Sequence, residues 1–290
     1  MASLNLTKKF VILAFFLCSL AWARVYTFAV LGDAGVWDKH TKDIRKSIRN
    51  SADIHRLILP GDNLYDLKQS YFDVWSNWAG FSFSAVAIGN HTLGYKEEVE
   101  FFRLPGEYYT RVWGNDVLLI VLNSDNENSV DEQMIWLEGQ LKVASQQFVA
   151  LIYHHPTYTV SANHAWKEKK RFQNRLRDIL RRYADKIDLI INGHDHIASL
   201  VELDGKLPML ISGASFESRH AKPVDYKAED GTSVKTRWLY EDGSHWTRLD
   251  FNTEEGDVWI NFVDAKLNKV ECSIRAKDHK TTLNDNCIKG

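Results

Sequence analysis

The stretch "ILPGDNLYD", Ile58 to Asp66, passes from an apolar segment into Gly61-Asp62 and places a tyrosine three residues later. Glycine and asparagine are ordinary turn residues, but a turn does not require Tyr65. One interpretation is that Asp62 caps a helix and Tyr65 packs beneath it. The other is that both side chains hold a metal ion, and the remaining sequence discriminates between the two.

Five segments share one pattern, in which a short β-type run stops and a possible ligand follows at once. A single Asp, Asn or His at such a place is commonly a cap or a turn residue, whereas five in series favour a shared site. Ligand sites of open α/β sheets lie at the carboxyl ends of strands, so we expect these side chains to meet. The segments are "VYTFAVLGD" ending at Asp33, "RLILPGD" at Asp62, "SAVAIGNH" at Asn90 and His91, "FVALIYHH" at His154 and His155, and "DLIINGHDH" at His194 and His196.

Helix-like segments separate these strands, and the alternation predicts α/β layers. The clearest is "WKEKKRFQNRLRDILRRYA", with one apolar stripe along it; its basic face is either simply solvated or a field that attracts anionic substrate. After His196 the pattern changes to strands and glycine turns, which indicates hairpins. We therefore expect an α/β (α+β) fold, a four-layer α/β/β/α sandwich of two mixed sheets packed face to face with flanking helices, in a single domain over residues 24–290.

The N-terminus resembles an export signal. Lys8 and Lys9 precede an apolar run, Phe10 to Ala23, that ends in the small-x-small pattern Ala21-Trp22-Ala23. A membrane-spanning helix needs about 20 apolar residues, so a signal peptide over residues 1–23, cleaved after Ala23, is the preferred interpretation. An uncleaved anchor and a lipid on Cys18 are the alternatives. We expect an exported protein that is secreted, periplasmic or lysosomal.

Charge and cysteine content fit that expectation. The formal net charge of −2 gives no indication of nucleic acid or an anionic membrane as a partner. Cys272 and Cys287 form an even pair in an exported chain, which predicts a disulfide, with two free buried thiols as the alternative.

The donors at the strand ends suit two adjacent cations: two carboxylates, a phenol, an amide oxygen and three imidazoles. One shared carboxylate between two metals is typical of phosphoryl-transfer sites. Such a pair neutralises the phosphate oxygens and supplies an in-line hydroxide. No Gly-rich P-loop with lysine and no Gly-x-Ser-x-Gly elbow occurs in the sequence.

The ordered motifs "GDAG", "GDNLY", "GNH", "HHP" and "GHDH" resemble those of the calcineurin-like metallophosphoesterases, and Tyr65 narrows the resemblance to the purple acid phosphatases of the small tartrate-resistant type. It runs from about Tyr26 to Ile211. It implies an acid phosphatase that hydrolyses phosphate monoesters by a metal-bound hydroxide at a dinuclear centre of Fe(III) and a divalent metal, Fe(II), Zn(II) or Mn(II). Ferric iron is a stronger Lewis acid than zinc, so hydroxide would remain available in acid.

The resemblance also implies a role for each residue. The ferric ligands would be Asp33, Tyr65 and His196, and the divalent ligands Asn90, His154 and His194, with Asp62 bridging. His91 and His164 would act on substrate, binding phosphate oxygen or protonating the leaving group. His155 is interpreted as a structural neighbour.

Two departures from the family pattern leave these ligands intact. "GDAGV" lacks the aromatic residue and second glycine that often follow the first Asp, and Thr92 stands where an acidic residue is common. The alternatives are a phosphodiesterase of the same superfamily and a non-catalytic metal- or phosphate-binding protein. We expect a monomer acting on small-molecule or phosphoprotein phosphomonoesters, without nucleic-acid partners and without membrane attachment once the signal is cleaved.

Overall fold

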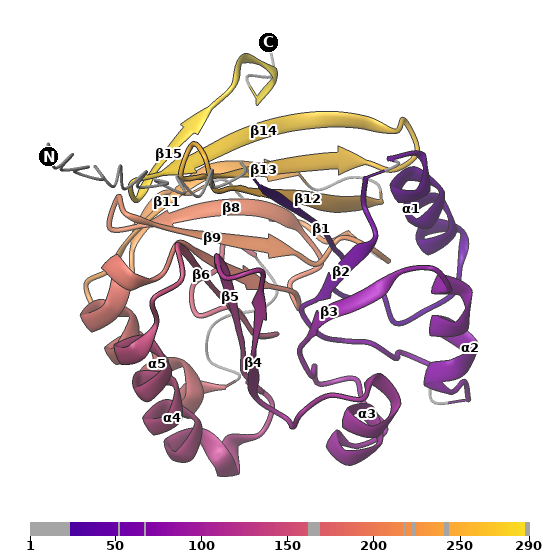
Figure 1. Cartoon of the computed structure of the whole chain (residues 1–290), viewed down its shortest axis with the longest axis horizontal. Helices are drawn as coiled ribbons and strands as arrows, with labels where there is room; N and C mark the ends of the chain where they lie inside the picture. The colour runs from indigo at the N-terminus through magenta and orange to yellow at the C-terminus, as the bar shows by residue number, and fades with distance from the viewer. Residues whose placement is uncertain are drawn as a thin grey trace, which may run out of the picture.

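Two β-sheets packed face to face form the centre of the molecule, with helices outside them (Figure 1). This confirms the predicted fold class. The predicted signal peptide and His164 lie outside the described residues. The computed structural model describes residues 24–287 except 52, 67, 162–168, 217, 222–223 and 241–243.

The first sheet has seven strands in the order β15-β14-β13-β12-β1-β2-β3. Strands β1, β2 and β3 are parallel, and the other pairs are antiparallel. The C-terminal strands therefore join the N-terminal ones through β12, which pairs with β1. The strands are β1 (Val25–Val30), β2 (Arg56–Leu59), β3 (Ser82–Val86), β12 (His245–Asn252), β13 (Asp257–Asp264), β14 (Lys269–Lys277) and β15 (Lys280–Leu283).

The second sheet has eight strands in the order β10-β11-β8-β9-β7-β6-β5-β4. Strands β5, β6, β7 and β9 are parallel, whereas β4, β8, β10 and β11 pair antiparallel with their neighbours. The predicted hairpin after His196 is present as β8 and β9, although β9 also pairs with β7. The strands are β4 (Tyr109–Trp113), β5 (Val117–Val121), β6 (Phe148–Ile152), β7 (Leu189–Asn192), β8 (Ala198–Leu203), β9 (Leu207–Ser212), β10 (Tyr226–Lys227) and β11 (Ser233–Tyr240).

Helices α4 (Val130–Val143) and α5 (Lys170–Tyr183) pack on the outer face of the second sheet. The apolar stripe of α5 is buried there as the sequence predicts, except that Tyr183 is half-buried. On its polar side, Arg171 and Arg182 lie 2.6 and 2.7 Å from Asp131 and Glu138 of α4. These exposed ion pairs are typical of a solvated helix face, and such pairs contribute little to stability.

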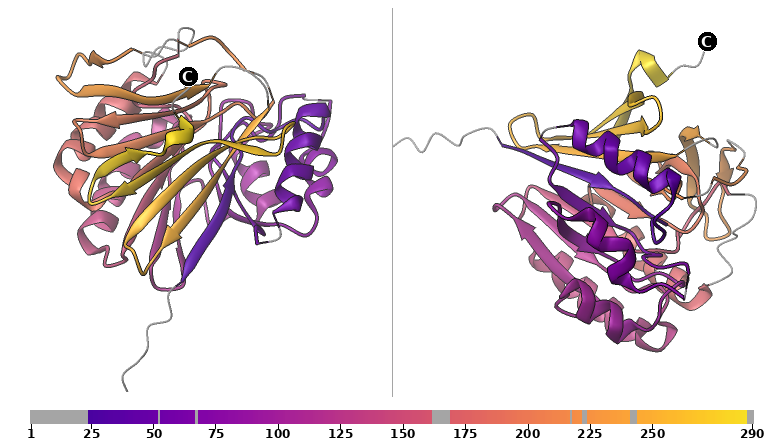
Figure 2. Two further views of the ribbon diagram at one scale, coloured as in Figure 1. Left: turned by 90° about the horizontal axis from the view of Figure 1, so that it is seen from above. Right: turned by 90° about the vertical axis from the view of Figure 1, so that its right-hand side faces the viewer.

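The helices beside the first sheet gather at its β1–β3 end (Figure 2). They are α1 (Lys39–Asn50), α2 (Tyr71–Trp75) and α3 (Tyr95–Phe102). Strands β13 and β14 largely alternate buried and half-buried side chains, as expected of a sheet with one face toward water. The outer helical layer of the first sheet is thus partial.

Local sequence explains where α1 begins. Asp38 Oδ1 accepts a hydrogen bond from the Thr41 amide, and Thr41 Oγ1 accepts one from the Asp38 amide, both at 3.0 Å. This reciprocal cap satisfies two amides that the helix itself cannot. Ile44 and Ile48, one turn apart, then bury α1 in the core.

A disulfide joins Cys272 in β14 to Cys287 in the C-terminal turn, as the sequence predicts. Within the part of the chain that the structure describes, no helix is long and apolar enough to cross a bilayer.

Parallel strands of both sheets end at a common edge. There the backbone links the sheets, because the Gly32 amide after β1 donates to the Ser212 carbonyl of β9 at 2.8 Å. The loops that follow β1 and β2 are joined in turn by the Asp33 amide and the Gly61 carbonyl, 3.1 Å apart. All five ligand-bearing segments leave the sheets at this edge.

Candidate metal centre

The glycines that precede the predicted ligands provide room for ligands from neighbouring strands. A Cβ atom at Gly89 would lie 2.1 Å from Asp62 Oδ1. One at Gly61 would lie 2.4 Å from the ring of His154, and one at Gly193 would lie 2.7 Å from Asp33 Oδ2. Since such distances are too short for any side chain, the repeated glycine is a packing requirement of the site.

Tyr65 lies at the centre of the first group of donors. Its hydroxyl oxygen is 2.9 Å from Asp33 Oδ1, 3.0 Å from Asp62 Oδ2 and 2.9 Å from His196 Nε2. Both carboxylates and the imidazole are buried. Tyr65 therefore contacts the three other side chains predicted to surround the ferric ion.

Asp62 also belongs to a second group of donors, through its other oxygen. Asp62 Oδ1 lies 3.1 Å from His154 Nε2, which is itself 3.1 Å from Asn90 Oδ1. The backbone amide of His91 donates to the same Asp62 oxygen at 2.9 Å. The two oxygens of Asp62 thus face two different sets of donors, as a bridging carboxylate must.

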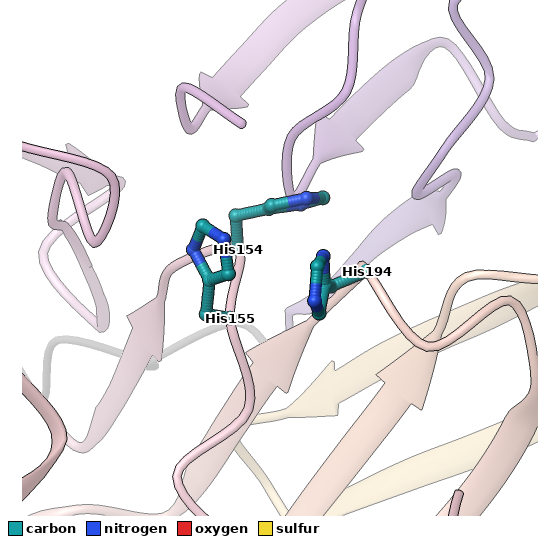
Figure 3. A group of neighbouring side chains, drawn as sticks. All are labelled: His154, His155 and His194. Carbon is teal, nitrogen blue, oxygen red and sulfur yellow. The ribbon is translucent and has the colours of Figure 1, made fainter. Parts of the chain in front are cut away.

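Three imidazoles gather where β6 and β7 end (Figure 3). The ring centroid of His194 lies 5.0 Å from that of His154 and 4.4 Å from that of His155. One nitrogen of each ring lies within 4.8 Å of the other two, a spacing that could accept a metal ion. His155 is held by Ser124, whose Oγ lies 2.9 Å from His155 Nδ1. The sequence interpretation assigned His155 a structural role and did not place its ring beside that of His194. The only feature of the sequence that pointed to this closeness is that His155 directly follows His154.

Four of the predicted ligands have a left-handed backbone conformation. The φ angles are +58° at Asp33, +53° at Asp62, +70° at His194 and +51° at His196. Non-glycine residues rarely adopt this conformation, and where they do, the surrounding structure has to compensate a strain of about 1–3 kcal/mol each. The chain therefore turns sharply at the ligands themselves.

Electrostatics at the site favour a bound cation. Burial, together with the nearby carboxylates Asp33 and Asp62, raises the pKa of Tyr65 well above its usual value, so the phenol does not ionise without a positive partner. Burial alone would raise the pKa of Asp62, but attraction to His154 outweighs it and lowers that pKa. For His154 burial favours the neutral ring, yet Asp62, Asp33 and the Pro60 carbonyl raise its pKa to about 9. The two buried carboxylates are thus stabilised by the protons on Tyr65 and His154. Metal ions could replace these protons and provide the positive charge instead.

His91, one of the two predicted substrate groups, is placed differently from the ligands. The exposed ring of His91 lies 4.6 Å from the ring of Tyr65, at the solvent side of the site. Phe216, which the sequence interpretation did not single out, approaches Tyr65 with ring centroids 5.4 Å apart. It follows a β-type run, but no motif distinguishes it from a core residue.

Several solved structures share this fold. "GAP50 the anchor in the inner membrane complex of Plasmodium" has a TM-score of 0.67 at 17% identity, covering 88% of this chain and 90% of that one. A purple acid phosphatase, PPD1 from yellow lupin (Lupinus luteus) seeds, has a TM-score of 0.67 at 15% identity over 89% of this chain, which spans only 55% of the lupin chain. A dimetal phosphatase from Danio rerio has a TM-score of 0.53 at 14% identity, covering 78% of this chain and 95% of that one. At these identities the likeness shows the fold alone.

Among curated protein sequences, the comparison found no match. The sequence profile described as calcineurin-like phosphoesterase matches residues 26–198. That range is more than half of the chain and includes every predicted ligand from Asp33 to His196. The chain therefore belongs to the calcineurin-like phosphoesterase family.

Proposed function

We propose that this protein is an acid phosphatase of the purple type, which hydrolyses phosphate monoesters at a centre of Fe(III) and a divalent metal. One observation carries the proposal: the two oxygens of Asp62 face two donor groups, and one of these groups contains the phenol of Tyr65. A phenolate is a hard anionic donor that suits a trivalent ion, whereas imidazole and amide donors suit Zn(II), Fe(II) or Mn(II).

The chain's own residues would divide the work. Asp33, Tyr65 and His196 would hold the ferric ion, Asn90, His154 and His194 the divalent ion, and Asp62 both. When bound, the two cations would neutralise the phosphate and provide the hydroxide that attacks it. The position of His91 beside Tyr65 supports a role in binding a phosphate oxygen or donating a proton to the leaving group. His164 keeps its proposed role on substrate from the sequence alone.

The compartment and partners follow from the sequence. We propose export with cleavage after Ala23, action as a monomer, and small-molecule or phosphoprotein phosphomonoesters as substrates. An iron centre that keeps hydroxide available in acid would suit a secreted, periplasmic or lysosomal protein.

The substrate class is tested with two aryl esters. The metal-loaded protein should hydrolyse p-nitrophenyl phosphate in acid and leave bis(p-nitrophenyl) phosphate largely intact, because the proposed site accepts one ester arm. Nitrophenolate release measures both rates. Faster hydrolysis of the diester would replace the proposal by the phosphodiesterase alternative, and absence of both activities would favour the non-catalytic alternative.

Metal content tests the bridging position of Asp62. Asp62→Ala should lose metal from both sites, whereas Asn90→Ala should lose mainly the divalent ion, because only Asp62 faces both donor groups. Elemental analysis of the two purified variants beside the wild type gives the stoichiometry, expected to be about two per wild-type chain. Equal losses in the two variants would contradict a bridging Asp62.

Colour tests Tyr65 as a ferric ligand. The oxidised protein should be violet or pink through charge transfer from the Tyr65 phenolate to Fe(III), and Tyr65→Phe should abolish the visible band. Absorption spectra before and after the substitution are the measurement. A colourless, fully active wild type that contains two zinc ions would exclude the ferric assignment.

Kinetics of a substituted His91 test its action on substrate. His91→Asn should keep the visible band and lower kcat by about 10²-fold, the low end of acid–base effects. The loss should be larger for an alkyl phosphate than for p-nitrophenyl phosphate, since an alkoxide needs a proton to leave and a nitrophenolate does not. His55→Asn, an exposed histidine that lies before β2, is the matched control and should leave both rates unchanged. Equal losses on the two substrates would remove the proton-donor role.

A further inference from the structure

A carboxylate outside the donor set, Glu98 in α3, is fully buried beside the metal centre. A buried carboxylate is costly unless its oxygens are hydrogen-bonded. Both oxygens of Glu98 have partners: Asn63 Nδ2 donates to Oε1 at 2.6 Å, and the Tyr71 hydroxyl donates to Oε2 at 2.9 Å. These partners lead to two different ligand segments.

The first partner, Asn63, directly follows Asp62 in the chain. The side-chain Nδ2 of Asn63 also donates to the Ala87 carbonyl at 2.9 Å. The backbone carbonyl of Asn63 accepts a hydrogen bond from Trp75 Nε1 at 2.8 Å. Asn63 is therefore held at its side chain and its backbone. Its bond to Glu98 fixes the segment that carries Asp62.

The second partner, Tyr71, leads to the segment that carries Asn90. The Tyr71 hydroxyl lies 2.8 Å from Thr92 Oγ1 and accepts a bond from the Leu93 amide at 3.4 Å. Thr92 closes a tight turn by accepting from the Gly94 amide at 3.2 Å. Through Tyr71, the same carboxylate holds the turn that follows Asn90 and His91.

We propose that Glu98 is a positioning residue that couples the Asp62 and Asn90 segments, so that Asp62 Oδ1 and Asn90 Oδ1 both face His154. The inference rests on the proposed function only in that these groups bind a metal ion. An acidic residue is missing at position 92, and Glu98 supplies a carboxylate to the same turn from α3.

The bonds of Glu98 can be made by a neutral group. Burial raises the pKa of Glu98 to about 7, an effect that the hydrogen bonds from Asn63, Thr92 and Tyr71 only partly oppose. Below that pH the side chain is a neutral acid, which glutamine matches in shape. The glutamine oxygen can accept the bond from Asn63, and its NH2 group can donate to the Tyr71 hydroxyl, which then donates to Thr92 Oγ1. Glutamine should therefore preserve the positioning, whereas alanine should remove it.

A matched control separates positioning from simple core stability. Glu202 in β8 is also buried, and it accepts hydrogen bonds from the backbone amide and hydroxyl of Thr281. Neither of these two hydrogen bonds reaches a ligand segment. Glu202→Ala should thus lower the thermal stability, as Glu98→Ala should, without changing the metal site.

The experiment measures how tightly Zn²⁺, added as the sole metal, binds to the metal-free full-length protein. The affinity is obtained by competition with a chromophoric chelator, at a temperature where all variants are folded. Glu98→Ala should weaken the Zn²⁺ affinity by about 10–100-fold, the usual effect of losing support behind metal ligands. Glu98→Gln should retain most of the affinity, and Glu202→Ala should match the wild type. Circular dichroism of each metal-free variant verifies the fold.

Equal Zn²⁺ affinity of Glu98→Ala and Glu202→Ala would overturn the inference and leave the proposed function intact. If Glu98→Ala does not fold, Tyr71→Phe decides, because it removes one hydroxyl and keeps the ring packed on Phe101 and Phe102. That variant should weaken Zn²⁺ binding, and an unchanged affinity would overturn the inference. A wild type that binds no Zn²⁺ would instead refute the metal centre itself.

Discussion

Two carboxylates buried side by side, Asp33 and Asp62, are the constraint on which the rest of the structure depends. Both lie against the hydroxyl of Tyr65, and both are almost fully shielded from water. Like charges in a poorly solvated place repel strongly, so the arrangement requires positive charge nearby. The imidazoles of His154 and His196 and the phenol of Tyr65 contact these carboxylates, and each of the three groups can also act as a donor to a cation.

Backbone conformation brings these donors together at the sheet edge. The left-handed residues at Asp33, Asp62, His194 and His196 make the chain reverse direction where it leaves a strand. Glycines ahead of the ligands remove the Cβ atoms that would block the neighbouring donor. The strands that precede these turns are fixed by the core between the two sheets and by the hydrogen bond from the Gly32 amide to the Ser212 carbonyl. The positions of the donor atoms are thus fixed by strained turns that are anchored on rigid strands.

Periodicity and turn residues allowed much of this fold to be predicted. Helix α5 lies within the predicted segment "WKEKKRFQNRLRDILRRYA", and the strand ends meet as expected. Strand order could not be predicted, because the insertion of β12 beside β1 depends on contacts far apart in sequence. Glu98 escaped prediction since its helix carries no motif, and its partners only meet through folding. The closeness of the His155 and His194 rings could not be predicted, because a doublet of histidines does not indicate which ring faces the neighbouring strand.

The pairing of β1 with β12 has a consequence for the order in which the chain can fold. Thr27 and Asp250 hydrogen-bond across these strands although they are 223 residues apart. Closing such a long loop has an entropic cost that must be met before the contact is formed, and topologies of this kind fold slowly. During synthesis, β1 can pair with β2 early, but its neighbour on the other side, β12, becomes available only when nearly the whole polypeptide has left the ribosome.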